Sequence, residues 1–159
     1  MTTFSSEDIK QLYKAEGRIP YAVEEAISKY KKWRLITINP NKIDSHIDQY
    51  AFEGKSEKPR FDRMVRAIKT GKDINPILIE NTIQPAHAHQ VEGATFEEPI
   101  DGYARLAAHK KANIPIKVLV PERVAKRISA KHTSKRKYIQ RARVKKTTMS
   151  ISGSRRIGV

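Results

Sequence analysis

At 159 residues, of which 38% are hydrophobic, the chain is long enough for one domain with a core and an additional arm. It has no cysteine, which excludes disulfides, thiolate metal sites and cysteine nucleophiles. It also has no apolar run long enough to cross a membrane, and together these two observations predict a cytoplasmic protein. Residues 121–159 hold 13 Lys and Arg and one acid, Glu122, and so carry +12 of the formal net charge of +15, an imbalance that favours a polyanionic partner.

Two helices are predicted in the first part of the chain. Ser5 or Ser6, followed by two acids, is typical of a helix N-terminus, and Gly17 is placed to end that helix. Apolar side chains at helical spacing predict a second helix over about residues 21–33. We interpret residues 1–33 as an N-terminal helical extension.

The next part of the chain, residues 34–121, alternates between runs typical of strands and amphipathic runs typical of helices. The predicted strands cover 35–38, 76–80 and 116–120, and the predicted helices cover 61–71 and 101–112. The order strand, helix, strand, helix, strand predicts a small α/β domain. Residues 81–99 show no clear period and contain two prolines and a glycine, so they form either a hairpin or a mobile flap.

Two histidines in this last segment, His87 and His89, would point to the same side of a strand. Together with Glu92 or Asp101 they are candidate ligands for a divalent metal, because imidazole and carboxylate groups bind such ions. Two histidines are weak evidence for a metal site, and the simpler interpretation is that they are exposed. We therefore assign no metal ligand.

The most specific feature of the domain is the junction at residues 100–105, where an extended segment turns into a helix. Free backbone N–H groups at a helix start, Gly102 allowing close approach, and Arg105 one turn further on can form a phosphate cradle. The alternative is an ordinary turn, in which Asp101 caps the helix and Arg105 lies on a solvated face. Spacing alone leaves both interpretations open.

The arrangement of these elements resembles the N-terminal domain of ParB-type partition proteins and the wider ParB/sulfiredoxin fold. The runs that carry the resemblance are Phe61–Glu80, Asp101–Ala108 and Ile114–Val120, preceded by Leu35–Asn41, which is similar to the strand and Asn-Pro turn that open that domain. The resemblance covers about residues 33–121. It implies a compact ParB/sulfiredoxin-like α/β domain over 34–121, with the helical extension before it and a basic C-terminal arm over 122–159.

The resemblance also implies a nucleotide or phosphate site at the start of the second domain helix. Gly102 and Arg105 match the phosphate-binding Gly and Arg of the family, and Asn75 stands where partition proteins commonly have Gln. Partition proteins have Glu-Arg where this chain has Tyr103-Ala104, so one charged phosphate partner is missing, which argues against ordinary cytidine-triphosphate switching. The position of Tyr103 is also informative. Sulfiredoxins have a catalytic Cys there, so sulfinic acid reduction is excluded. The implied cofactors are a nucleoside triphosphate and Mg²⁺.

We predict a nucleic-acid-binding protein with a ParB-like nucleotide or phosphate site, of the kind found on bacterial plasmids and phages, with DNA as the favoured ligand. One alternative is a nucleotide-dependent enzyme of the same fold, such as an NTPase, a nuclease or a small-molecule kinase. Another is a phage protein that binds a host or virion protein. An enzyme needs a carboxylate base near Arg105, and Asp101 or Glu98 is the candidate.

The basic arm carries the predicted nucleic-acid contacts, with Tyr138 as the aromatic residue among neighbouring cations. Its apolar residues predict two helices broken near residues 132–134. The predicted contact residues are Lys131, Lys135, Arg136, Lys137, Tyr138, Arg141, Arg143, Lys145, Lys146, Arg155 and Arg156.

Overall fold

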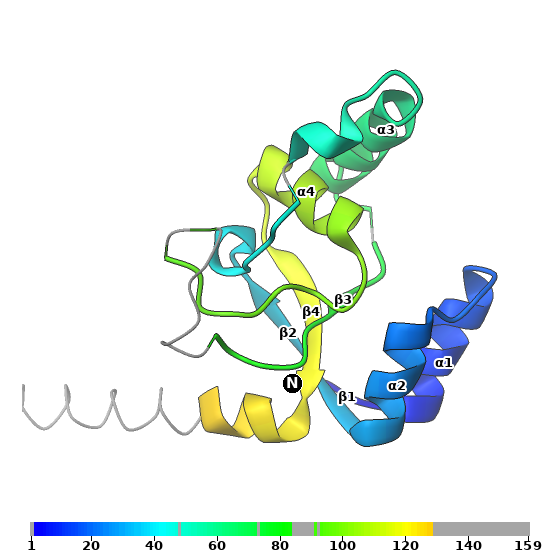
Figure 1. Ribbon diagram of the computed structural model, residues 1–159, viewed down its shortest axis with the longest axis vertical. Coiled ribbons are helices and arrows are strands. Elements are labelled where there is room, and N and C mark those ends of the chain that lie inside the picture. Colours follow the sequence, from blue (N-terminus) through cyan, green and yellow to red (C-terminus); the bar gives the residue numbers. More distant parts are fainter. Residues whose placement is uncertain (1, 48, 73, 84–90, 92, 129–159) are drawn as a thin grey trace, which may run out of the picture. The chain divides into compact units, whose positions relative to one another are not determined.

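The computed structural model describes residues 2–47, 49–72, 74–83, 91 and 93–128 (Figure 1). Within these residues the centre is a four-stranded mixed sheet in the order β1-β2-β4-β3. The strands are β1 (Thr2–Ser5), β2 (Lys32–Ile38), β3 (Ile77–Leu78) and β4 (Ile116–Pro121). β2 is antiparallel to both β1 and β4, whereas β3 is parallel to β4. The prediction of a mixed α/β domain is confirmed.

Helices lie between the strands along the chain. They are α1 (Ser6–Ala15), α2 (Tyr21–Lys29), η1 (Pro40–Lys42), η2 (Gln49–Phe52), α3 (Lys58–Lys69) and α4 (Tyr103–Ala112), and residues 122–128 are also helical. α1 begins at a capping box, in which Asp8 N–H donates to Ser5 Oγ and Ser5 N–H donates to Asp8 Oδ2. Among the described residues no helix has the length and apolar character needed to cross a membrane.

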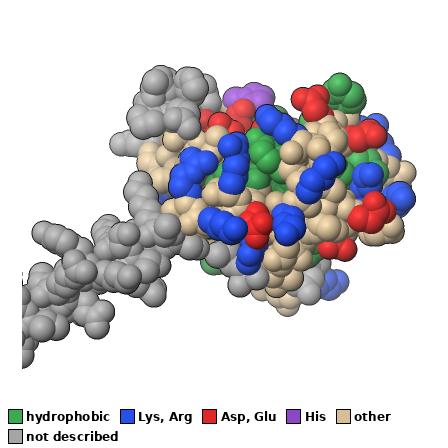
Figure 2. Space-filling view, turned by 90° about the horizontal axis from the view of Figure 1, so that it is seen from below, with side chains coloured by type: hydrophobic (Ala, Val, Ile, Leu, Met, Phe, Trp, Pro, Cys, Tyr) green, Lys and Arg blue, Asp and Glu red, His purple; other side chains and the backbone are tan. Residues whose placement is uncertain are grey.

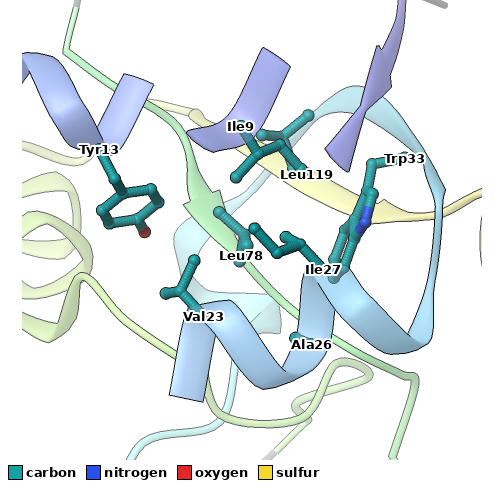
Figure 3. Close-up of a cluster of buried hydrophobic side chains, with 8 residues drawn as sticks. All are labelled: Ile9, Tyr13, Val23, Ala26, Ile27, Trp33, Leu78 and Leu119. Carbon is teal, nitrogen blue, oxygen red and sulfur yellow. The ribbon is translucent and has the colours of Figure 1, made fainter. Parts of the chain in front are cut away.

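One face of the sheet is covered by α1 and α2 (Figures 1 and 3). Their apolar side chains pack against Trp33 of β2, Leu78 of β3 and Leu119 of β4, all of which are fully buried. The buried members of this cluster are Ile9, Tyr13, Val23, Ala26, Ile27, Trp33, Leu78 and Leu119. A second cluster joins α3 to α4 through Phe61, Val65, Ile68, Ala107 and Ala108.

The N-terminal segment is part of the core, and this corrects its interpretation as an extension. β1, which was not predicted, is an edge strand whose Phe4 lies opposite Trp33 of β2. α2 ends at Lys29, earlier than expected, because Trp33 is already in the sheet opposite Pro121. The compact unit runs from residue 1 to residue 124, and so crosses both predicted boundaries.

The described ends of the segment 81–99 pair with each other. The N–H of Ile83 donates to the carbonyl of Thr95 at 2.9 Å, and the N–H of Glu97 donates to the carbonyl of Asn81 at 3.1 Å. Such reciprocal bonding between the two ends is typical of paired strands. It favours the hairpin alternative for these ends.

Candidate functional site

α4 begins at a glycine whose backbone conformation other residues rarely adopt. Gly102 has a φ of +96°, in the left-handed region that costs an L-residue about 1–2 kcal/mol. A Cβ atom here would lie 2.5 Å from Ile77 Cγ2 of β3 and 3.2 Å from Arg105 Nε. The glycine therefore allows the start of α4 to approach the sheet closely, and side chains fill the space beside it.

Arg105, the predicted phosphate contact, is directed back into the protein. Only 13% of its side chain is exposed. Nη1 donates hydrogen bonds to the carbonyl oxygens of Asn75 at 3.0 Å and Pro76 at 3.2 Å, and Nη2 donates to Asp101 Oδ2 at 3.2 Å. The guanidinium therefore joins the start of α4 to the loop that precedes β3.

The structure brings Asn75, Asp101 and Arg105 together, and α1 completes the cluster. The side chain of Asn75 donates to Glu16 Oε1 at 2.6 Å, and the same oxygen lies 3.8 Å from Arg105 Nη1. Asp101 Oδ2 accepts a hydrogen bond from the Tyr13 hydroxyl at 3.0 Å. Because it already accepts from a phenol and a guanidinium, Asp101 is a weak candidate for a general base. Sequence reasoning missed Tyr13 of α1 and Glu16, which directly follows α1, because their partners are 88 and 59 positions away.

Two tyrosines near the start of α4 face carboxylates. Burial raises the pKa of Tyr13, and the negative charge of Asp101 raises it further. Burial also raises the pKa of Tyr103 to about 12, with the charge of Glu98 as the next cause. The Tyr103 hydroxyl lies 3.5 Å from Glu98 Oε2 and donates to it. Both phenols are therefore neutral donors at physiological pH.

Glu98, the other candidate base, is held by a histidine that the sequence analysis did not single out. Its Oε1 accepts a hydrogen bond from the backbone N–H of His46 and also contacts the Nδ1 of the same residue. The imidazole packs edge-on against the Tyr103 ring, with 5.5 Å between the ring centroids. Glu98 thus joins the loop after η1 to the segment before α4. No local pattern around His46 marks this role.

The raised tyrosine pKa values predict a loss of stability at alkaline pH. A phenol whose pKa is higher in the folded protein stabilises the fold. This stabilisation is fully present below the pKa of the phenol in the unfolded chain, near 10, and is lost as the pH rises through its pKa in the folded protein. We expect the free energy of unfolding to fall between about pH 10 and 12, and Tyr103→Phe to remove part of that fall. Urea denaturation across this range measures the effect, with Tyr21→Phe, at an 80% exposed residue, as the control. An unchanged pH dependence in Tyr103→Phe would contradict this explanation.

A separate group of cations lies where α2 leads into β2 and where the helix over 122–128 begins. Arg123 Nη2 donates to the Tyr30 hydroxyl at 2.9 Å, and Lys29 Nζ lies 5.3 Å from the centre of the same ring. Arg34 of β2 forms a 2.7 Å ion pair with Glu122. Figure 2 shows Lys and Arg side chains, with Asp and Glu side chains among them, on the surface seen from below. Sequence reasoning missed this group because the net charge of residues 1–120 is small. They hold 19 basic and 16 acidic side chains, and the linear sequence does not show which of these lie together.

The remaining candidates fall outside the described residues. These are the possible metal ligands His87, His89 and Glu92 and all predicted nucleic-acid contacts from Lys131 to Arg156. In the part of the chain that the structure describes, no group of three or more His, Cys, Asp or Glu side chains could hold a metal ion.

No family model, no curated protein and no solved structure matches this chain.

Proposed function

We propose that this chain is a nucleic-acid-binding protein that holds DNA mainly by the phosphate backbone. The observation that carries the proposal is the location of the excess charge, because residues 121–159 hold 13 Lys and Arg against one acid. Contacts between such side chains and phosphates release condensed counterions, which gives affinity without reading the base sequence. Of these 13 cations, the compact unit of residues 1–124 contains only Arg123.

The described contacts support a phosphate interface at the surface better than one at the start of α4. The donors of Arg105 already bind Asn75, Pro76 and Asp101, and a nucleotide phosphate would have to displace these partners. The nucleoside triphosphate and Mg²⁺ that the family resemblance implies therefore fit this site poorly. Arg123, in contrast, is exposed.

A ParB/sulfiredoxin-like fold is part of the same proposal. The order β2, α3, β3, α4, β4 and the Gly-x-x-Arg start of α4 support it. The setting that this proposal implies is the bacterial cytoplasm, with the chain belonging to a phage or plasmid.

The enzyme alternatives receive less support, because the carboxylates of Asp101 and Glu98 accept hydrogen bonds from protein groups.

Titration of the full chain against a fluorescently labelled DNA duplex at several salt concentrations tests the proposal. If the protein meets about six phosphates, the logarithm of the binding constant should fall against the logarithm of salt with a slope near −5. For comparison, calorimetric titration with each of the four nucleoside triphosphates tests whether the start of α4 binds a nucleotide. A folded chain that fails to bind DNA at low salt would contradict the proposal.

A further inference from the structure

The surface around Tyr30 carries two cations, Lys29 and Arg123, whose charged groups lie over its ring, and two more, Lys31 and Lys32, follow Tyr30 directly in the chain. Lys29 ends α2, Lys31 and Lys32 lead into β2, and Arg123 lies in the first turn of the helix over 122–128. All four side chains are exposed. None of them forms an ion pair with a carboxylate of the described residues. We call this surface the Tyr30 face.

The single acid of the basic segment is paired with a fifth cation. Glu122 Oε1 accepts a 2.7 Å hydrogen bond from Arg34 Nη2, and the two side chains are 23% and 28% exposed. This ion pair holds the first turn of the helix to β2, so that Arg123 lies next to Tyr30. The carboxylate of Glu122 thus helps to position Arg123, and its charge is paired with that of Arg34.

Tyr30 orients the guanidinium of Arg123 and is not free to stack on a base. Its hydroxyl accepts a hydrogen bond from Arg123 Nη2, and Arg123 Cζ and Lys29 Nζ lie 5.0 and 5.3 Å from its ring centre. Trp33 packs against it edge-on, with 6.0 Å between ring centroids. The exposed aromatic Tyr21 begins α2, about 13–14 Å away from Tyr30 along the helix. The face therefore presents cations without a stacking platform.

We propose, on the premise that the chain binds nucleic acid, that the Tyr30 face is the folded domain's part of the interface and that it binds the phosphates of a DNA duplex. A duplex stacks its bases inside and carries its phosphates outside, which matches a face of cations. A single strand presents bases, which proteins commonly hold on exposed aromatic rings. Arg123 belongs both to this face and to the basic arm over 122–159, whose further cations follow it along the chain.

The double variant Lys31→Gln/Lys32→Gln in the full chain tests this inference. Both side chains are exposed, so the fold should be kept, and circular dichroism checks this. On a DNA duplex, loss of two phosphate contacts should reduce the salt slope by about 1.8, at about 0.9 per phosphate. Arg123→Gln should reduce it by about 0.9. The matched control is Lys55→Gln/Lys72→Gln, which removes the same charge from exposed positions near the two ends of α3 and should leave the slope unchanged.

The outcomes separate this inference from the proposed function. If the wild type binds DNA and Lys31→Gln/Lys32→Gln leaves its slope unchanged, the arm alone forms the interface and the Tyr30 face has no part in it. An equal loss in the control pair would show that only net charge matters, and would also overturn the inference. Weakened binding of a single strand or of duplex RNA, with DNA duplex binding intact, would assign the face to a different ligand. A wild type that binds no DNA overturns both proposals.

Discussion

Removing residues 129–159 should abolish most of the affinity for DNA while the core stays folded. The removed segment holds ten Lys and Arg and no acid. The cut leaves the compact unit, which ends at residue 124, and it keeps Glu122 and Arg123 with their partners Arg34 and Tyr30. If about half of about six phosphate contacts belong to residues 129–159 and the rest to the Tyr30 face, affinity at physiological salt should fall roughly tenfold to a hundredfold and the slope should lose about half of its value near −5.

Anisotropy titrations of the two chains against the same duplex measure this loss, and circular dichroism shows whether the shortened chain is folded. The control is a shorter deletion, of residues 150–159, which removes two arginines and should lower the slope by less than about 2. A shortened, folded chain with unchanged affinity and slope would assign the whole interface to the core. The arm would then need another explanation.

Arg105→Ala should destabilise the fold by about 3 kcal/mol, because the guanidinium is mostly buried and holds three elements together. The substitution leaves the carbonyls of Asn75 and Pro76 without their donor, and it leaves the carboxylate of Asp101 without its cation. The charged pair alone accounts for less than this, since the Asp101 side chain is one-third exposed and its charge is screened by solvent.

Urea denaturation measures this change, and Arg105→Lys is the matched variant. A lysine keeps the charge beside Asp101 but lacks the planar fork that reaches both carbonyls, so it should recover only part of the lost stability. The prediction separates two roles for Arg105. If Arg105→Ala keeps the stability of the wild type and instead loses binding of a nucleoside triphosphate, the guanidinium is a ligand contact and the internal contacts are secondary.

Several elements were predictable from local sequence because their stabilising contacts are local. The capping box at Ser5 and Asp8 closes within four residues, and the start of α4 requires the glycine at position 102 whatever lies around it. The apolar run of β4 is long enough to indicate a buried strand. β1 was missed, since a strand of four mostly exposed residues has no periodic signal and forms its hydrogen bonds with β2, about 30 positions away.

The sequence by itself determined the charge distribution, the mixed α/β class and the chemical identity of the residues at the start of α4. Composition and short-range periodicity can be obtained from the linear sequence without knowing the fold. Only the tertiary structure decided what those residues contact. Arg105 follows Gly102 in a spacing that suits a phosphate, yet its donors bind Asn75, Pro76 and Asp101 because folding brings the loop before β3 against α4. The Tyr30 face likewise exists only because the pairing of β2 with β4 brings Arg123 beside Tyr30, across 93 positions of the chain.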